Sequence, residues 1–124
     1  MTTESADCLL SAKSCRPCEG GVAPLPETKA AQLLQQVDGW ELAEGGRKIR
    51  RRWNVRNFVA GIEFLNDVAD LAEQEGHHPD VHLTGYRDVT IELTTHAIGG
   101  LSENDFILAA KIDELPVSLQ QPTA

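Results

Sequence analysis

The sequence has few aromatic and few basic side chains. Three Phe, two Trp and one Tyr are its only aromatic residues, so aliphatic side chains must fill most of the core that a one-domain chain of 124 residues buries. The formal net charge of −8 argues against nucleic acid as the main partner, because nucleic acid favours a basic surface. The one basic run, Arg50–Arg52, would alternate between two faces in a strand, which favours a solvated strand over a phosphate site.

Long apolar runs are also absent. No stretch approaches the roughly 20 apolar residues that span a bilayer. The N-terminal residues contain no apolar core of a signal peptide, and the acidic Glu4 and Asp7 are atypical of a transit peptide. We therefore expect a cytoplasmic protein without a membrane partner.

Cysteine is scarce and odd in number, so a disulfide framework is not predicted. Cys15 and Cys18 form a CxxC pair, but a zinc site commonly needs a second pair, and Cys8 adds only one thiolate with no histidine nearby. A thioredoxin-like site would need a strand before the pair. These absences favour a structural or incidental role, and a metal or redox role is the alternative.

Hydrophobic periodicity divides the chain into three parts. Residues 1–26 predict an irregular leader, 27–115 the folded domain, and 116–124 a frayed tail. Within the domain, the pattern predicts helices and strands over 27–37 (helix), 40–44 and 48–55 (strands), 58–75 (helix), 81–84 and 87–95 (strands) and 103–112 (helix). This α-β-β-α-β-β-α order predicts an α+β fold, a four-stranded antiparallel sheet with helices packed on one face. The other face is left to solvent or to a partner subunit.

The longest predicted helix begins after a plausible N-cap, Asn57, and ends at Gly76. It has a broad apolar stripe, predicted to face the core: Phe58, Ile62, Leu65, Ala69 and Ala72, with Gly61, Phe64, Val68 and Leu71 beside them.

All four histidines lie between positions 77 and 96, and two of them are adjacent. Pro79 excludes helix at His78, so the pair lies where the helix gives way to an extended segment. In a strand, His78 and His82 would be roughly 13 Å apart at 3.3 Å per residue, too far to share one metal ion easily. Imidazole exchanges protons near neutral pH, so acid–base chemistry is the favoured interpretation.

Two carboxylates are candidates for orienting these imidazoles. Glu73 lies one helical turn before His77, and Asp105 at the start of the last helix is placed to reach His96. Each has a simpler explanation: Glu73 as a solvated helix residue, and Asp105 as the capping-box partner of Ser102. The simpler explanation for His82 is a surface strand residue, and for this residue it is the favoured one.

A specific combination of motifs runs through these positions: Glu73-x-x-x-His77-His78-Pro79, then Tyr86, then Thr95-His96-x-x-Gly99-Gly100-Leu101-Ser102-x-x-Asp105. Over residues 27–114 the chain resembles the pterin-4a-carbinolamine dehydratase family. The leader Cys15-x-Pro17-Cys18-Glu19-Gly20-Gly21 is similar to one found on many bacterial and plant members. The resemblance implies the αββαββα fold and a homodimer or homotetramer in which sheet edges and helices associate.

The resemblance also implies an activity, removal of water from a 4a-hydroxytetrahydropterin during tetrahydrobiopterin recycling. It implies that His77 and His96 are the acid/base pair and that His78 mainly holds the pterin. Glu73 and Asp105 would orient these imidazoles. The resemblance implies no metal or organic cofactor, and it suggests an aromatic amino acid hydroxylase as the metabolic partner.

Two features depart from the animal members. The spacing from His77-His78-Pro79 to Thr95-His96 is one residue longer, which we place in the Thr84-Gly85-Tyr86 turn, and Asn104 stands where those members have arginine. Relatives of the fold also act as scaffolds, in Rubisco assembly or as dimerisation cofactors of a homeodomain transcription factor. The retained histidines and carboxylates favour the enzyme over such a scaffold.

Overall fold

The computed structural model describes residues 10–15 and 23–120. The predicted roles of Cys8 and Cys18 therefore lie outside the described residues. The helices and strands are α2 (Glu27–Leu34), β1 (Glu41–Ala43), β2 (Lys48–Asn54), α3 (Phe58–Glu75), β3 (Asp80–Thr84), β4 (Asp88–Leu93) and α4 (Glu103–Asp113), with short 3-10 turns η1 (Leu10–Ala12), η2 (Glu44–Gly46) and η3 (His96–Ile98).

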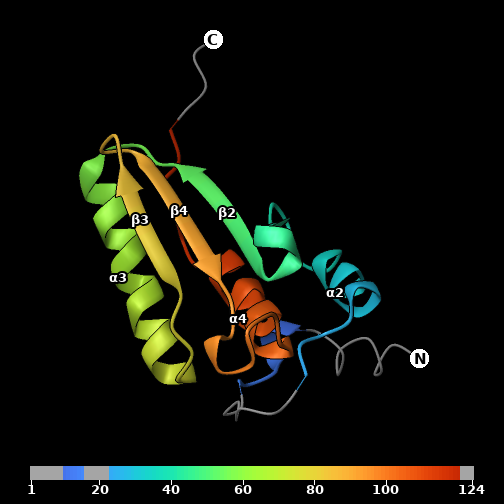
Figure 1. The fold of residues 1–124 in the computed structure, drawn as a ribbon. Helices are drawn as coiled ribbons and strands as arrows, with labels where there is room; N and C mark the ends of the chain where they lie inside the picture. The colour runs from blue at the N-terminus through green and yellow to red at the C-terminus, as the bar shows by residue number, and fades with distance from the viewer. Residues whose placement is uncertain (1–9, 16–22, 121–124) are drawn as a thin grey trace.

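The four strands form one antiparallel sheet in the order β1-β2-β4-β3. Figure 1 shows α3 and α4 behind the sheet. The two central strands of the sheet are β2 and β4. The predicted α+β architecture is confirmed. Because β4 is central and η3 and α4 follow it directly, the segment from His96 to Asp105 returns to the helical side of the molecule.

The core lies between the sheet and the helices. Alternation in β4 sends Val89, Ile91 and Leu93 inward, each 0% exposed, and they meet Phe64 of α3 and Phe106 of α4 in one apolar cluster. Burial of each such side chain is worth about 1.5–3 kcal/mol relative to exposure. The opposite phase of β2 and β4 carries Arg50, Arg52, Thr90 and Glu92, as the predicted half-solvated sheet requires.

The basic run, Arg50–Arg52, lies in β2, and its side chains alternate between the two faces of the sheet. Arg51 points to the helical side, where its Nη1 donates to Asp113 Oδ1 at 2.7 Å and its guanidinium stacks 4.8 Å from the centre of the Trp53 ring. Its neighbour Arg50 pairs with Glu92 on the other side at 2.7 Å. These two arginines are therefore engaged by carboxylates of the chain itself, and the phosphate-site alternative gains no support.

Helix α3 begins and ends as predicted, but the predicted stripe is partly wrong. Asn57 accepts a hydrogen bond from the Ala60 N–H at 2.8 Å, and Gly76 takes the left-handed conformation (φ 66°) that ends the helix. The buried face is Ala60, Gly61, Phe64, Val68 and Ala72. Phe58, Ile62 and Ala69 face outward, because apolar residues surround more of α3 than one sheet can cover.

Described residues near both termini make contacts that were not predicted. Leu10 of the leader is 3% exposed and belongs to the core. In the tail, Arg56 N–H donates to Ser118 O at 2.8 Å and Gln120 N–H to Asn54 O at 2.9 Å. Residues 118–120 thus pair with residues 54–56 at the end of β2, and this described part of the predicted tail is not frayed. In the described part of the chain, no helix is long and apolar enough to cross a bilayer.

Candidate functional site

His77 follows the end of α3 directly. Gly76 has the left-handed backbone that a helix end needs, and the His77 N–H still donates to Ala72 O at 3.2 Å. Pro79 then forces an extended path into β3. Because the chain turns at Gly76, the His77 ring leaves the axis of α3 and lies against the first turn of α4.

Asp105 occupies the first turn of α4 and is 0% exposed. Ser102 and Asp105 form the predicted capping box, in which Asp105 Oδ2 accepts the Ser102 N–H at 2.9 Å. The same oxygen accepts the Thr95 hydroxyl at 2.8 Å. A buried carboxylate needs such donors, since desolvation without them would cost several kcal/mol.

The other carboxylate oxygen holds His77. Asp105 Oδ1 lies 2.6 Å from His77 Nε2, and the His77 side chain is 13% exposed. A carboxylate accepts hydrogen bonds and cannot donate them, so Nε2 carries the proton of this bond. Nδ1 of the neutral ring is then left with the lone pair, and it is the atom that can take up a proton.

The predicted pairing of carboxylates and imidazoles is wrong. Asp105 binds His77 and not His96, and Glu73 binds His78, with Glu73 Oε2 2.6 Å from His78 Nε2. The prediction counted one helical turn from Glu73 to His77, but the left-handed Gly76 interrupts the helix before His77. Glu73 and His78 are both well exposed, so this contact orients the ring more than it stabilises the fold.

His96 lies on the loop that Asp105 also holds. It opens η3, directly after Thr95, and the loop closes through Thr95 N–H to Gly100 O at 2.9 Å. Its exposed ring borders a cavity of about 240 Å³ that Glu44, Arg47, Lys48, Thr94 and Gly99 complete. Asp105 therefore connects His77 and, through Thr95, the loop that carries the second candidate imidazole.

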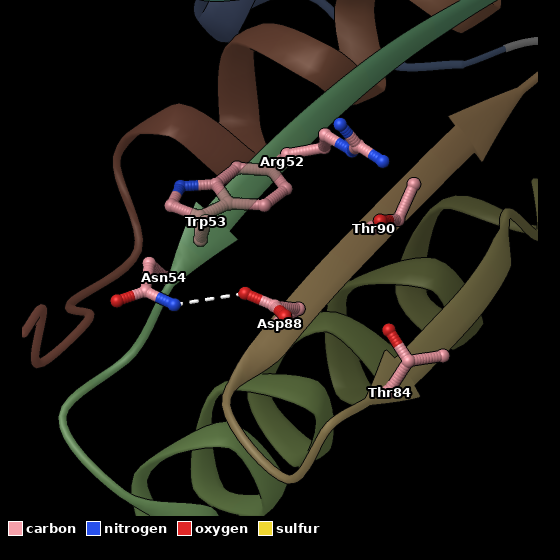
Figure 2. A pocket seen from close by; sticks show the side chains of 6 residues that line it. All are labelled: Arg52, Trp53, Asn54, Thr84, Asp88 and Thr90. Carbon is pink, nitrogen blue, oxygen red and sulfur yellow. Dashed lines mark hydrogen bonds between the residues drawn. The ribbon is translucent and has the colours of Figure 1, made fainter.

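His78 borders a different, more apolar cavity. This one has a volume of about 190 Å³ and lies between α3 and the start of β3, with Leu65, Ala69, Glu73 and Val81 among its walls. The cavities at His78 and His96 are separate in the single chain. A larger cavity of about 400 Å³ on the outer sheet face contains no histidine; Figure 2 shows Arg52, Thr84 and Thr90 around it and the hydrogen bond from Asn54 to Asp88.

His82 stands apart from these groups. Its side chain is half exposed on the outer sheet face, with Nε2 3.7 Å from Glu92 Oε1. The interpretation of His82 as a surface strand residue is confirmed. Within residues 10–15 and 23–120, no three His, Cys, Asp or Glu side chains are grouped to hold a metal ion.

Comparison with known proteins identifies the family. Residues 23–115 match the family model described as pterin 4 alpha carbinolamine dehydratase. The chain is 54% identical over 111 residues to pterin-4-alpha-carbinolamine dehydratase 2, mitochondrial, from Arabidopsis thaliana; the match covers 87% of this chain and 59% of that protein. This chain belongs to the pterin-4-alpha-carbinolamine dehydratase family.

Bacterial relatives match over nearly their whole length. A putative pterin-4-alpha-carbinolamine dehydratase of Nitrosomonas eutropha is 49% identical, with 90% of this chain and 96% of that protein covered. Among solved structures, a transcriptional coactivator/pterin dehydratase from Brucella melitensis shares 30% identity with a TM-score of 0.68, over 73% of this chain and 95% of that one. The family assignment and the fold thus agree.

Sequence reasoning missed the role of Thr95, whose hydroxyl also binds the carboxylate that holds His77. Thr95 Oγ1 contacts Ser102 Oγ at 2.7 Å as well as Asp105, so the two hydroxyls and the buried carboxylate form one hydrogen-bonded network. The available signal was the buried phase of β4: Thr95 falls on the side of Leu93, where a polar side chain needs a partner.

Proposed function

We propose that the protein removes water from a 4a-hydroxytetrahydropterin by acid–base catalysis between His77 and His96. The observation that carries the proposal is the fully buried Asp105, which binds His77 and, through Thr95, holds the loop of His96. Membership of the pterin-4-alpha-carbinolamine dehydratase family supports the same substrate class.

The chemistry needs two proton transfers at neighbouring atoms. One imidazolium gives a proton to the hydroxyl on C4a as the C–O bond breaks and water leaves. One neutral imidazole takes the proton from N5 as the C4a=N5 double bond of the quinonoid dihydropterin forms. Each transfer contributes about 10²–10⁴-fold to the rate. After both transfers the two imidazoles have exchanged protonation states.

Asp105 supports the imidazole that it binds. It keeps Nε2 protonated, so Nδ1 is the reacting atom, and it stabilises the imidazolium when that atom takes up a proton. His78 is the proposed pterin-holding residue, with Glu73 orienting its ring. The proposed reaction uses no metal and no organic cofactor.

A direct assay tests the function. Purified protein should accelerate dehydration of synthetic 4a-hydroxytetrahydropterin, followed by the absorbance of quinonoid dihydropterin. A rate equal to that in buffer would contradict the proposal. Activity unchanged after EDTA treatment is expected, whereas a loss that added metal restores would show that the mechanism is incomplete.

A protein-binding scaffold is the second candidate. A pterin dehydratase-like protein described as a RuBisCO assembly factor in the alpha-carboxysome shares the fold, with a TM-score of 0.51 at 24% identity, so the fold itself is compatible with such a role. A transcription-factor dimerisation cofactor is the other scaffold role. A scaffold would keep its function in a His77→Ala, His96→Ala double variant, whereas the enzyme would not.

The surface of the single chain supports a homodimer or homotetramer. Phe58, Val59 and Ile62 on α3 are 51%, 61% and 39% exposed, and Val81 on the edge strand β3 is 45% exposed. Apolar surface of this kind commonly marks an interaction site. We also propose a cytoplasmic location and a role in tetrahydrobiopterin recycling beside an aromatic amino acid hydroxylase.

A further inference from the structure

The N-terminal segment, residues 10–15, lies along α4. Figure 1 shows its short helix η1, coloured blue, beside α4. Lys13 Nζ pairs with Glu103 Oε2 at 2.6 Å in the first turn of α4, and Lys111 Nζ in the last turn donates to Ser11 O at 3.1 Å. With Leu10 in the core, the segment is attached at both ends of α4.

Glu75 joins this segment to α3. It is the last residue of α3, two positions before His77, and its side chain is only 11% exposed. Its Oε1 accepts the backbone N–H of Cys15 at 2.8 Å, and its Oε2 lies 3.5 Å from Lys111 Nζ. One carboxylate thus connects the end of α3 with the N-terminal segment and with α4.

The segment also contacts the residue before Asp105. Cys15 Sγ donates to the carbonyl of Asn104 at 3.6 Å. Burial, followed by the charge of Glu75 and its hydrogen bond, raises the pKa of the Cys15 thiol to about 12, and the charge of Asp105 adds to the shift. The N-terminal segment therefore contacts Glu75, two positions before His77, and Asn104, the residue before Asp105.

We propose that Glu75 and residues 10–15 are positioning elements that hold His77 against Asp105. The inference rests on the proposed function of that pair. A helix end followed by glycine is free to fray, and Gly76 is the only residue between Glu75 and His77. Anchoring Glu75 to α4 and to the segment fixes the point from which the His77 ring reaches Asp105.

The test compares carboxylate variants of α3 in the full chain. Glu75→Ala removes the acceptor, Glu75→Gln keeps an acceptor for the Cys15 N–H without the charge, and Asp70→Ala is the matched control, an exposed carboxylate on the same helix. Cys15→Ala removes the thiol and keeps the backbone N–H. The readouts are unfolding in urea, the hydrogen exchange of the His77 Nε2–H in histidine-labelled protein by NMR without substrate, and kcat and KM.

Glu75→Ala should speed exchange of the His77 Nε2–H at least about tenfold and lower kcat about tenfold with little change in KM, because misplacement of a reacting group acts on the chemical step. Glu75→Gln should fall between Glu75→Ala and the wild type. Cys15→Ala keeps the backbone N–H that Glu75 accepts, so the positioning role predicts little change; Asp70→Ala, the exposed control, should match the wild type. If Glu75→Ala does not fold, Glu75→Gln carries the same comparison.

Exchange and kcat equal to those of Asp70→Ala would overturn the positioning role. The exchange measurement needs no substrate, so it decides this inference even if the dehydratase assay fails. Faster exchange in a protein without dehydratase activity would support the positioning of His77 while contradicting the proposed function.

Discussion

At the scale of single residues, the two imidazoles should be separable from the other histidines by substitution. His77→Ala and His96→Ala should each lower kcat by about 10²–10⁴-fold, because each removes one proton-transfer group. His82→Ala, on the outer sheet face, should retain the wild-type rate. The measurement is the dehydration assay, with circular dichroism to show that each variant is folded; full rates in both site variants would contradict the assignment.

Asp105 should be far more sensitive than Glu73, although both bind a histidine. Asp105→Asn replaces an acceptor of three hydrogen bonds by a group that presents N–H to one of those donors, at a fully buried position. We expect a loss of about 2–4 kcal/mol in the free energy of unfolding. Glu73→Gln, on an exposed side chain, should cost under about 0.5 kcal/mol.

Urea unfolding of both variants at neutral pH measures the difference. Equal losses would show that burial of Asp105 does not carry the stability assigned to it. An Asp105→Asn variant that keeps its stability but loses kcat would instead assign the carboxylate to catalysis alone.

The Cys15 thiol should be inert in the folded protein. Since burial and the nearby Glu75 raise its pKa to about 12, the thiolate at pH 8 is about 1,000-fold scarcer than for an ordinary cysteine. Iodoacetamide labelling, followed by peptide mass spectrometry, should modify Cys15 slowly in native protein and rapidly in denaturant. Equal rates in the two conditions would revive a reactive role for this cysteine.

At the scale of elements, the outer face of the sheet contributes stability that depends on pH. Burial opposes ionisation of Glu92, but Arg50 and Lys48 outweigh it through hydrogen bonds and charge, so the pKa of this carboxyl is lowered from its ordinary value of 4.5. A lowered pKa stabilises the fold above the unfolded-state pKa, and this stabilisation is lost as the pH falls through the folded-state pKa.

Glu92→Gln should therefore be less stable than the wild type at pH 7, by about 0.5–1 kcal/mol after allowance for solvent screening. The difference should shrink as the pH falls below 4.5. Unfolding curves of both proteins between pH 7 and about pH 3 check this, with His82→Ala as the control for the weaker contact at 3.7 Å. A difference independent of pH would point to packing and not to charge.

At the scale of the whole molecule, the outward apolar residues of α3 predict self-association. Ile62→Glu places a charge among exposed apolar neighbours without touching the buried face of the helix. The variant should remain folded and elute at a lower mass in light-scattering chromatography than the wild type. Asp70→Ala on the same helix is the control, and a wild-type protein that is already monomeric would contradict the proposed oligomer.

The sequence alone determined the helix caps, the helix end at Gly76 and the alternation of the strands. Asn57 and Ser102 cap helices through contacts within four residues, Gly76 ends α3, and alternation in β4 sorts inward from outward side chains. Each of these depends on neighbours along the chain, so the seven elements and the antiparallel sheet could be predicted.

Only the tertiary structure decided which groups meet. Asp105 binds His77 because Gly76 turns the chain out of α3 and α4 packs beside that turn, a relation that spacing along the sequence does not contain. Phe64 and Ile62 are both hydrophobic, but only Phe64 is buried, because its side of α3 faces the sheet. Likewise, Cys15 reaches Glu75 across sixty positions, since both lie where α3 and α4 converge.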